Sequence, residues 1–411
     1  MEIYVAHMPL IGLAVNVRSI AIFLAYLILA FSILLIYRNF NEKRIGVVEL
    51  LFILVNMLFV AKYSVRVSES FAPVATLSSF VFYYFLLQFR FKIHSLSFKK
   101  YIWGVCLLAI MGMVVVQYVI DPYSVQVDRW SALHFPIHNL LSGIYPYTAN
   151  THLGGNASPF PVWQILHIPF YLLRNVGLSF FAAIALFLWS CWKVQGREKT
   201  LVICLLMCSS IAVWYEVSVR SDLITNFLFL AAIINVVFPH LNQQWVEKHQ
   251  WWIACAVGLS ASTRILVLIP ILLLMLPYFI KMNWRNQIAV TLLTSAVFAL
   301  TFVPFAVWDW HEFYYFQNNP WSLQVRQGNL SDFILFVPLA IFLSMNYKGN
   351  SQRYFRNTAV MLVIFIAVTF VHNMYIGENW DLFSSTYDIT YFSTALPFCL
   401  LALGEKTIPD R

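Results

Sequence analysis

Long apolar runs, separated by short polar segments, fill most of the 411-residue chain. Many runs approach the ~20 residues that a helix needs to cross a bilayer, and they lack the period-two alternation of a membrane β-barrel. Because backbone groups in lipid must be hydrogen-bonded within the protein, we expect helices. The pattern predicts an all-α, polytopic transmembrane helical bundle of about thirteen helices. The predicted spans are residues 19–37, 46–64, 71–89, 102–120, 177–194, 200–217, 222–239, 251–264, 265–281, 288–307, 331–346, 357–375 and 389–404.

The longest polar interruption covers residues 119–159 and holds carboxylates, histidines and aromatic side chains together. The apolar stretch that follows, residues 159–175, carries prolines near both ends, so it predicts a short helix at the membrane surface rather than a span. We expect one integral-membrane domain, residues 1–411. Its parts are an N-terminal three-helix unit (1–101), a core (102–345) with an outer loop (121–176), and C-terminal helices (346–411).

The composition, with 61% hydrophobic and 11% charged residues, leaves no stretch long enough for an independent soluble domain. The net charge of +8 lies in short basic clusters between apolar runs. The positive-inside rule explains such clusters better than a nucleic-acid partner does. With the N-terminus outside, most acidic residues fall on the outer side. We therefore predict a multi-pass protein in contact with membrane lipids, located in the cell (inner) membrane with the polar loop on the outer face.

The six cysteines lie within or at the ends of apolar segments. We interpret them as small core residues, since neither a disulfide framework nor a zinc motif is present.

Two carboxylates, Asp121 and Asp128, follow the predicted helix at 102–120. Carboxylates close to hydrocarbon are costly and are usually paired or functional. Asp121 is explained equally well as a solvated charge at a helix end. Asp128 is the stronger candidate because of the motifs that follow it.

These motifs are Val127-Asp128-Arg129-Trp130, then Gly143-Ile144-Tyr145-Pro146-Tyr147, then Ser158-Pro159-Phe160-Pro161 at the start of an apolar helix. Their order resembles the outer loop of the GT-C superfamily of membrane glycosyltransferases, and within it the polyprenyl-phosphate-mannose-dependent mannosyltransferases. Residues 220–226, 258–264 and 328–331 also look similar, so the resemblance spans roughly residues 102–345. It implies an inverting transfer of a sugar, mannose-like, from a polyprenyl-phosphate donor to a lipid-linked or cell-surface glycan at the outer face, without a cofactor.

The residues present suit that chemistry. One positioned carboxylate can take the proton of an acceptor hydroxyl, and such bases contribute ~10²–10⁴-fold. Asp128 is our candidate base, with Asp121 as the second choice. The departing polyprenyl phosphate needs fixed cations. Arg264, Arg220 and Arg129 are the candidates, although arginines that snorkel to the interface are common.

Histidines and aromatic residues supply candidates for binding the sugar and the acceptor. His134 and His138 are one helical turn apart, but Pro136 lies between them and no zinc-binding HExxH motif exists, so we predict no metal site. Tyr145 and Tyr147 belong to the loop motif. Trp310 and His311 lie in a second outer loop rich in aromatic residues, where a membrane-interface belt is the alternative explanation.

Two other functions remain open. A non-enzymatic transporter or flippase of lipid-linked saccharide should carry ionisable residues near the middle of its helices, whereas here nearly all lie near helix ends. An O-antigen polymerase or ligase also uses lipid-linked sugars, but those enzymes rely on arginine-rich outer loops, and the main outer loop here holds few arginines.

Overall fold

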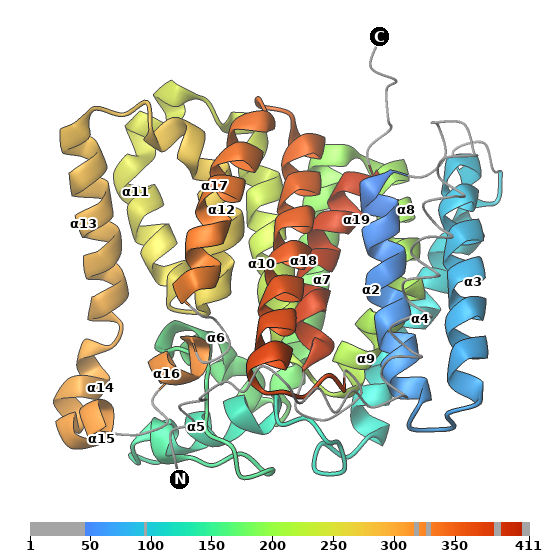
Figure 1. Cartoon of the computed structure of the whole chain (residues 1–411), viewed down its shortest axis with the longest axis horizontal. Helices are drawn as coiled ribbons and strands as arrows, with labels where there is room; N and C mark the ends of the chain where they lie inside the picture. Colours follow the sequence, from blue (N-terminus) through green and yellow to red (C-terminus); the bar gives the residue numbers. More distant parts are fainter. Residues whose placement is uncertain (1–45, 94–96, 316–319, 326–329, 382–387, 405–411) are drawn as a thin grey trace.

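The computed structural model describes residues 46–93, 97–315, 320–325, 330–381 and 388–404, and these form a helical bundle (Figure 1). The predicted span at 19–37 lies outside the described residues. The longer helices, in chain order, are α2 (Val47–Ser64), α3 (Phe71–Ile93), α4 (Lys99–Val119), α5 (Ser131–Leu141), α6 (Pro161–Leu172), α7 (Ser179–Gln195), α8 (Arg197–Ser209), α9 (Ile211–Ser218), α10 (Asp222–Val237), α11 (Gln243–Ala261), α12 (Leu268–Phe279), α13 (Trp284–Leu300), α17 (Leu330–Asn346), α18 (Ser351–Ile376) and α19 (Leu396–Gly404). Three short α-helices, α14 (Val303–Trp308), α15 (Trp310–Tyr315) and α16 (Pro320–Val325), and five 3-10 turns, η1 (Pro146–Thr148), η2 (Val176–Leu178), η3 (Phe238–His240), η4 (Ile265–Val267) and η5 (Ile389–Ala395), complete the described elements.

The helical fold class is confirmed for the described residues, but thirteen spans are not. Six helices there are long and apolar enough to cross a membrane, or seven if the bent pair α8 and α9 counts as one span. The six are Val47–Ser64, Phe71–Arg90, Lys99–Val119, Val176–Gln195, Asp222–His240 and Ser351–Ile376. Three other predicted spans coincide with the shorter apolar helices Ile265–Phe279, Phe336–Asn346 and Ile389–Gly404. These findings describe a membrane protein.

The predicted span 200–217 is broken at Ser210, where α8 and α9 meet at 64°. Ser210 has extended backbone angles, and its hydroxyl caps α9 by accepting from the Val213 N–H. The buried Asn56 side chain of α2 accepts from the Ser210 hydroxyl at 2.7 Å and from the Ala212 N–H at 3.2 Å. These bonds satisfy the Ala212 and Val213 N–H groups that the break frees, and the Tyr83 hydroxyl accepts from the Ile211 N–H at 2.9 Å. An apolar interior requires such partners. A hydropathy pattern carries no sign of such a break.

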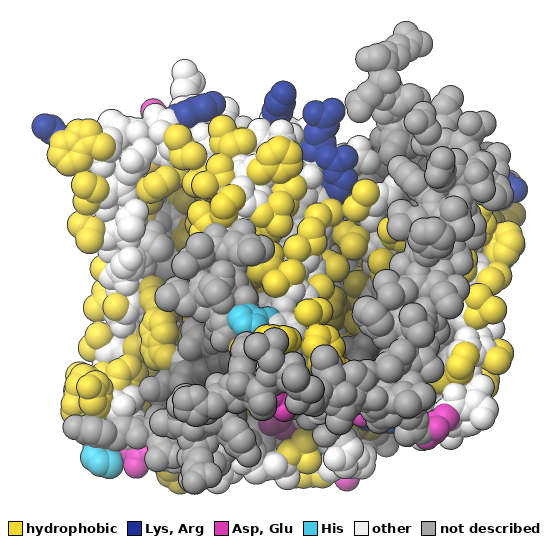
Figure 2. All heavy atoms as spheres, in the orientation of Figure 1, with side chains coloured by type: hydrophobic (Ala, Val, Ile, Leu, Met, Phe, Trp, Pro, Cys, Tyr) yellow, Lys and Arg dark blue, Asp and Glu magenta, His cyan; other side chains and the backbone are white. Residues whose placement is uncertain are grey.

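The charges separate toward the two ends of the bundle (Figure 2). Helices α5, α6 and α14 to α16 gather at one end, which we call the polar end (Figure 1). Most Lys and Arg side chains visible in Figure 2 lie at the opposite end, and most acidic ones lie at the polar end. The separation agrees with the expected basic and acidic sides of the chain.

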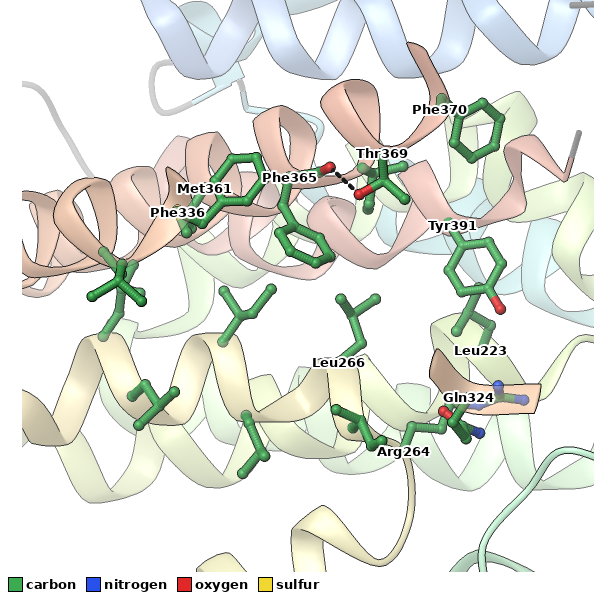
Figure 3. A pocket seen from close by; sticks show the side chains of 18 residues that line it. Leu223, Arg264, Leu266, Gln324, Phe336, Met361, Phe365, Thr369, Phe370 and Tyr391 are labelled. Carbon is green, nitrogen blue, oxygen red and sulfur yellow. Dashed lines mark hydrogen bonds between the residues drawn. The ribbon is translucent and has the colours of Figure 1, made fainter. Parts of the chain in front are cut away.

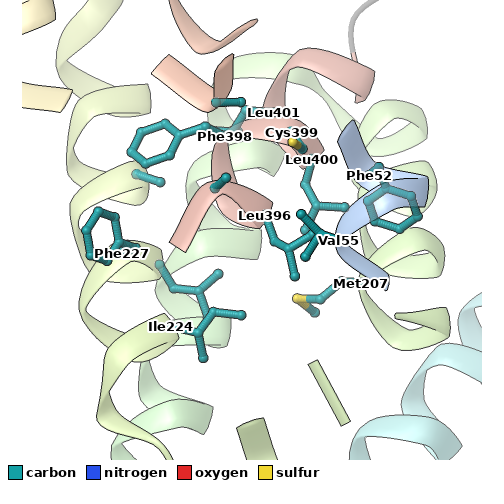
Figure 4. Packing of buried hydrophobic residues seen from close by; sticks show 14 of the residues in the cluster. Phe52, Val55, Met207, Ile224, Phe227, Leu396, Phe398, Cys399, Leu400 and Leu401 are labelled. Carbon is teal, nitrogen blue, oxygen red and sulfur yellow. The ribbon is translucent and has the colours of Figure 1, made fainter. Parts of the chain in front are cut away.

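The largest hydrophobic cluster joins residues from α2 through α19 (Figure 4). Phe52 and Val55 of α2 contribute to it beside Ile224 of α10 and Leu396 of α19. This part of the N-terminal unit is therefore packed into the same core as the C-terminal helices.

Helices α11 and α13 approach each other through small residues. Ala254, Gly258 and Ala261 are the spaced small positions on the buried face of α11. A Cβ atom at Gly258 would lie 2.7 Å from the Thr294 carbonyl oxygen of α13, and the Thr294 hydroxyl donates to the Ala254 carbonyl at 3.3 Å. Small residues that allow close backbone approach are typical of helix pairs in membranes.

We predict that Gly258→Ala destabilises the protein by about 1–3 kcal/mol, because the added methyl group must push α13 away. Gly104→Ala is the matched control, since a Cβ at Gly104 meets nothing within 4 Å and alanine favours a helix. Thermal unfolding of the purified protein in detergent measures both. Equal melting temperatures for the two variants would contradict the close packing of α11 and α13.

Candidate functional site

A buried ion pair lies where α10 begins. Asp222 Oδ2 accepts from Arg264 Nη2 at 2.5 Å, from Arg264 Nε at 3.1 Å and from the Trp163 indole N–H at 2.8 Å. Both charged side chains are almost fully buried. The three residues come from α10, from the break between α11 and α12, and from α6, so the pair fastens three separate segments together.

The local backbone explains how these residues reach one another. The Ser221 hydroxyl caps α10 by accepting from the Leu223 N–H, which sets Asp222 in the first turn, where the helix dipole favours a negative charge. Arg264 has an extended backbone between α11 and η4. This break in the hairpin aims its side chain at Asp222 instead of along a helix surface.

A second ion pair joins Arg129 of the polar loop to Asp388, which caps η5. The Arg129 guanidinium also lies 5.1 Å from the centre of the Tyr391 ring, at cation–π distance. Burial alone would raise the pKa of Asp388, but Arg129 and the hydrogen bonds from Thr390 outweigh it and hold that pKa below its usual value. Both partners are therefore charged at neutral pH.

Two other nearby carboxylates also affect the pKa of Arg129. Burial alone would lower its pKa, but the charge of Asp388, followed by Tyr391, Asp222 and Asp128, raises the pKa well above its usual value. Arg129 thus lies in the combined field of both ion pairs and of the candidate base.

An apolar cavity of about 240 Å³ ends at these residues (Figure 3). Its walls come from α12, α17 and α18 and carry aliphatic and phenylalanine side chains, whereas Arg264, Gln324 and Tyr391 lie at one end. The Tyr391 hydroxyl points toward the end where Arg264 and Gln324 lie (Figure 3). A cavity of this shape suits an amphiphile with a long apolar part and a polar head.

Gln324 connects this end of the cavity to the polar loop. Its side-chain amide, on α16, donates to the Ser158 carbonyl at 2.8 Å. Ser158 directly precedes the proline-rich start of α6. The loop that contains the predicted motifs is therefore held against the end of the cavity where Arg264 and Tyr391 lie.

The two candidate bases differ in their surroundings. Asp128 is half-buried, and its Oδ2 accepts from the Thr151 hydroxyl at 3.0 Å. Asp121 is exposed, and its Oδ1 accepts from the Tyr123 N–H in a local turn. The solvated-turn interpretation therefore describes Asp121. Asp128 adjoins Arg129, which contacts the cavity residue Tyr391. Asp128 is therefore better placed than Asp121 to act as the base.

The three candidate arginines are also placed differently. Arg264 lines the cavity, and the Arg129 guanidinium lies over the ring of Tyr391. Arg220 has a left-handed backbone (φ 52°), and its guanidinium donates to the Gln117 and Ile120 carbonyls at the end of α4. These bonds give Arg220 a structural role as a cap for α4.

His134 and His138 lie on α5 and meet Tyr171 of α6. His138 Nδ1 is 2.8 Å from the Tyr171 hydroxyl, and the His134 ring stacks on Trp130 with centroids 4.5 Å apart. Burial, with a smaller contribution from His138, lowers the pKa of His134 to about 4. His134 is therefore neutral at pH 7. Neither histidine lines the cavity.

The predicted aromatic residues fall into two groups. Tyr145 and Tyr147 are buried and pack with Phe305 of α14, and the Tyr147 hydroxyl donates to the Pro159 carbonyl at 3.3 Å. Trp310 and His311 are exposed on α15, where Trp310 stacks on Tyr314. Their contacts make the two tyrosines part of the loop's own core.

Several residues of the site were not among the predicted ones. Asp222 begins an apolar run directly after a serine, and Asp388 begins another two residues before a threonine. In both cases the acid at the start of a helix was a usable signal. Tyr391 and Gln324 carried no such signal. Trp163 and His167 lie in the predicted surface helix. Burial lowers the pKa of His167 to about 4, and the neutral ring bridges the Trp163 carbonyl and the Ser179 hydroxyl.

Comparisons of the chain with protein-family models, with curated proteins and with solved structures find no match.

We predict that Asp222→Asn lowers the free energy of unfolding by about 3–5 kcal/mol, because it leaves the Arg264 charge buried without a partner. Asp121→Asn, a change at an exposed carboxylate, is the matched control and should shift stability by less than about 0.5 kcal/mol. Thermal unfolding in detergent tests both variants. The double variant Asp222→Leu with Arg264→Met should be more stable than Asp222→Asn. If Asp222→Asn were as stable as Asp121→Asn, the ion pair would not hold these segments together.

Proposed function

We propose that the protein is a membrane glycosyltransferase that moves a mannose-like sugar from a polyprenyl-phosphate donor to a lipid-linked or cell-surface glycan acceptor. The observation that supports this most is the cavity with an apolar body and an arginine at its end. A polyprenyl chain is apolar and its phosphate is anionic, so the two halves of the cavity match the two halves of the donor. A volume of about 240 Å³ holds the part of the chain next to the phosphate, and the rest would continue into lipid.

Arg264 is held in place for this role. Its Nε and Nη2 groups bond Asp222, and its Nη1 group donates to none of the described residues. A phosphate oxygen at the cavity end would be the natural partner for Nη1. Because the site is fixed before the reaction, it stabilises the charge that grows on the departing phosphate without reorganising.

Asp128 would act as the general base. As the acceptor oxygen bonds to the anomeric carbon, its proton passes to the Asp128 carboxylate, and the bond from that carbon to the phosphate oxygen breaks. The phosphate leaves as an anion and needs no acid catalyst. Attack opposite to the leaving group inverts the anomeric centre. The polar end, which carries Asp128, would lie at the outer face of the cell (inner) membrane.

Transfer of radiolabelled mannose from polyprenyl-phosphate mannose, followed by glucose and arabinose donors, tests this function in membranes that contain the full chain. We expect Asp128→Asn to lower the rate by ~10²–10⁴-fold. Asp121→Asn is the matched control and should retain activity. Equal activity of the two variants would remove Asp128 as the base.

The cavity is tested separately by filling it. Ala340 lines the cavity on α17, and its neighbour Ile341 is exposed on the same helix. We expect Ala340→Phe to abolish binding of polyprenyl phosphate, measured by native mass spectrometry, and Ile341→Phe to retain it. Donor bound in the cavity without transfer to any acceptor would instead favour a transporter of lipid-linked saccharide. Binding that persists in Ala340→Phe would place the lipid elsewhere.

A further inference from the structure

Three cysteines meet in the apolar part of the bundle, outside the lining of the cavity and outside the two ion pairs. Cys106 lies on α4, and Cys204 and Cys208 lie one turn apart on α8. We call these three residues the thiol triad. Their Sγ atoms all lie within 4.8 Å of one another, and all three side chains are buried. Cys208 Sγ also donates to the Cys106 carbonyl oxygen at 3.7 Å.

The sequence interpretation of these cysteines as small core residues explains their burial but not their convergence. Free cysteine does behave as a small hydrophobic residue. The other three cysteines, Cys191, Cys255 and Cys399, need no other explanation, since none of them belongs to a group of three potential metal ligands among the described residues. The triad brings half of the cysteines of the chain to one point between two helices.

The spacing of the sulfur atoms suits a single metal ion. Thiolate sulfur binds at ~2.3 Å from a metal such as zinc, so three sulfur atoms around one ion lie ~4 Å apart. Sulfur atoms that already lie within 4.8 Å need only a small inward movement of their side chains to reach that spacing. The i, i+4 relation of Cys204 and Cys208 places both on one face of α8, toward α4.

The number of ligands favours one kind of ion. No histidine, aspartate or glutamate among the described residues joins the three sulfur atoms. Structural zinc sites take four ligands, whereas soft thiolate ligands without nitrogen or oxygen partners select Cu(I). Cu(I) is stable with three sulfur ligands, so the triad can complete its coordination alone.

The apolar surroundings of the thiol triad also favour Cu(I). Burying a net charge in such a place is costly. When Cu(I) binds with one thiolate and two neutral thiol ligands, three Cu–S bonds form, one S–H bond breaks, its proton leaves to solvent and the product is neutral. A divalent ion needs two thiols to lose protons before its charge is balanced. No change of oxidation state accompanies either step.

We propose that the thiol triad is a three-coordinate site for Cu(I). The proposal is independent of the glycosyltransferase function, because none of the three cysteines lines the cavity or contacts the ion pairs.

The test titrates the purified full chain in detergent, without oxygen, with Cu(I) in competition with the chelator bicinchoninate. We expect one Cu(I) per chain, with X-ray absorption showing three sulfur neighbours. Separate Cys106→Ala, Cys204→Ala and Cys208→Ala variants should each lose ~100-fold or more in affinity, since even changes outside the ligand set cost 10–100-fold. The matched controls Cys191→Ala, Cys255→Ala and Cys399→Ala should bind as the unchanged protein does.

Three outcomes would overturn the proposal. They are no Cu(I) held against the chelator, equal losses in the triad and control variants, or a disulfide between Cys106 and an α8 cysteine in the protein purified without reductant. If a triad variant fails to fold, the sulfur coordination number measured on the unchanged protein decides the question by itself.

Discussion

A polar group inside an apolar bundle must find its partner within the protein, and this requirement organises the structure. Asn56 meets the broken backbone at Ser210, and Asp222 meets Arg264 and Trp163. Each contact joins segments far apart in sequence. A buried ion pair adds little net stability relative to an apolar packing, but losing one partner is costly. These contacts therefore fix which segments lie together more than they raise overall stability.

The same contacts explain why the candidate site lies where helices are interrupted. Arg264 has an extended backbone between α11 and α12, and Asp388 precedes the 3-10 turn η5. Within a membrane, non-helical backbone is tolerated only where protein or a cavity surrounds it. At these interruptions side chains from different segments can converge. One end of the cavity lies at two such residues, Arg264 and Tyr391.

The sequence predicted the class of the fold and much of its division into helices, because length and hydropathy act locally. It placed Arg264 among the candidates from its position in an apolar hairpin, and Asp128 from its position after an apolar segment and from the motifs that follow it. It grouped Arg220 with Arg264, although the structure directs Arg220 to the carbonyl groups at the end of α4. Arg220 differs from Arg264 because its backbone is left-handed and because α4 lies beside it. The hydropathy pattern of the sequence shows neither feature.

The sequence by itself thus determined that this is a helical membrane protein with basic and acidic sides and one long polar loop, since each of these features follows from local composition. Tertiary structure alone decided which acid pairs with which arginine, where Ser210 breaks a span, and which cysteines meet. These outcomes depend on contacts between residues tens to hundreds of positions apart, as between Arg129 and Asp388. Such contacts are selected by packing and by the energy of burying charge, and no periodicity along the chain records them.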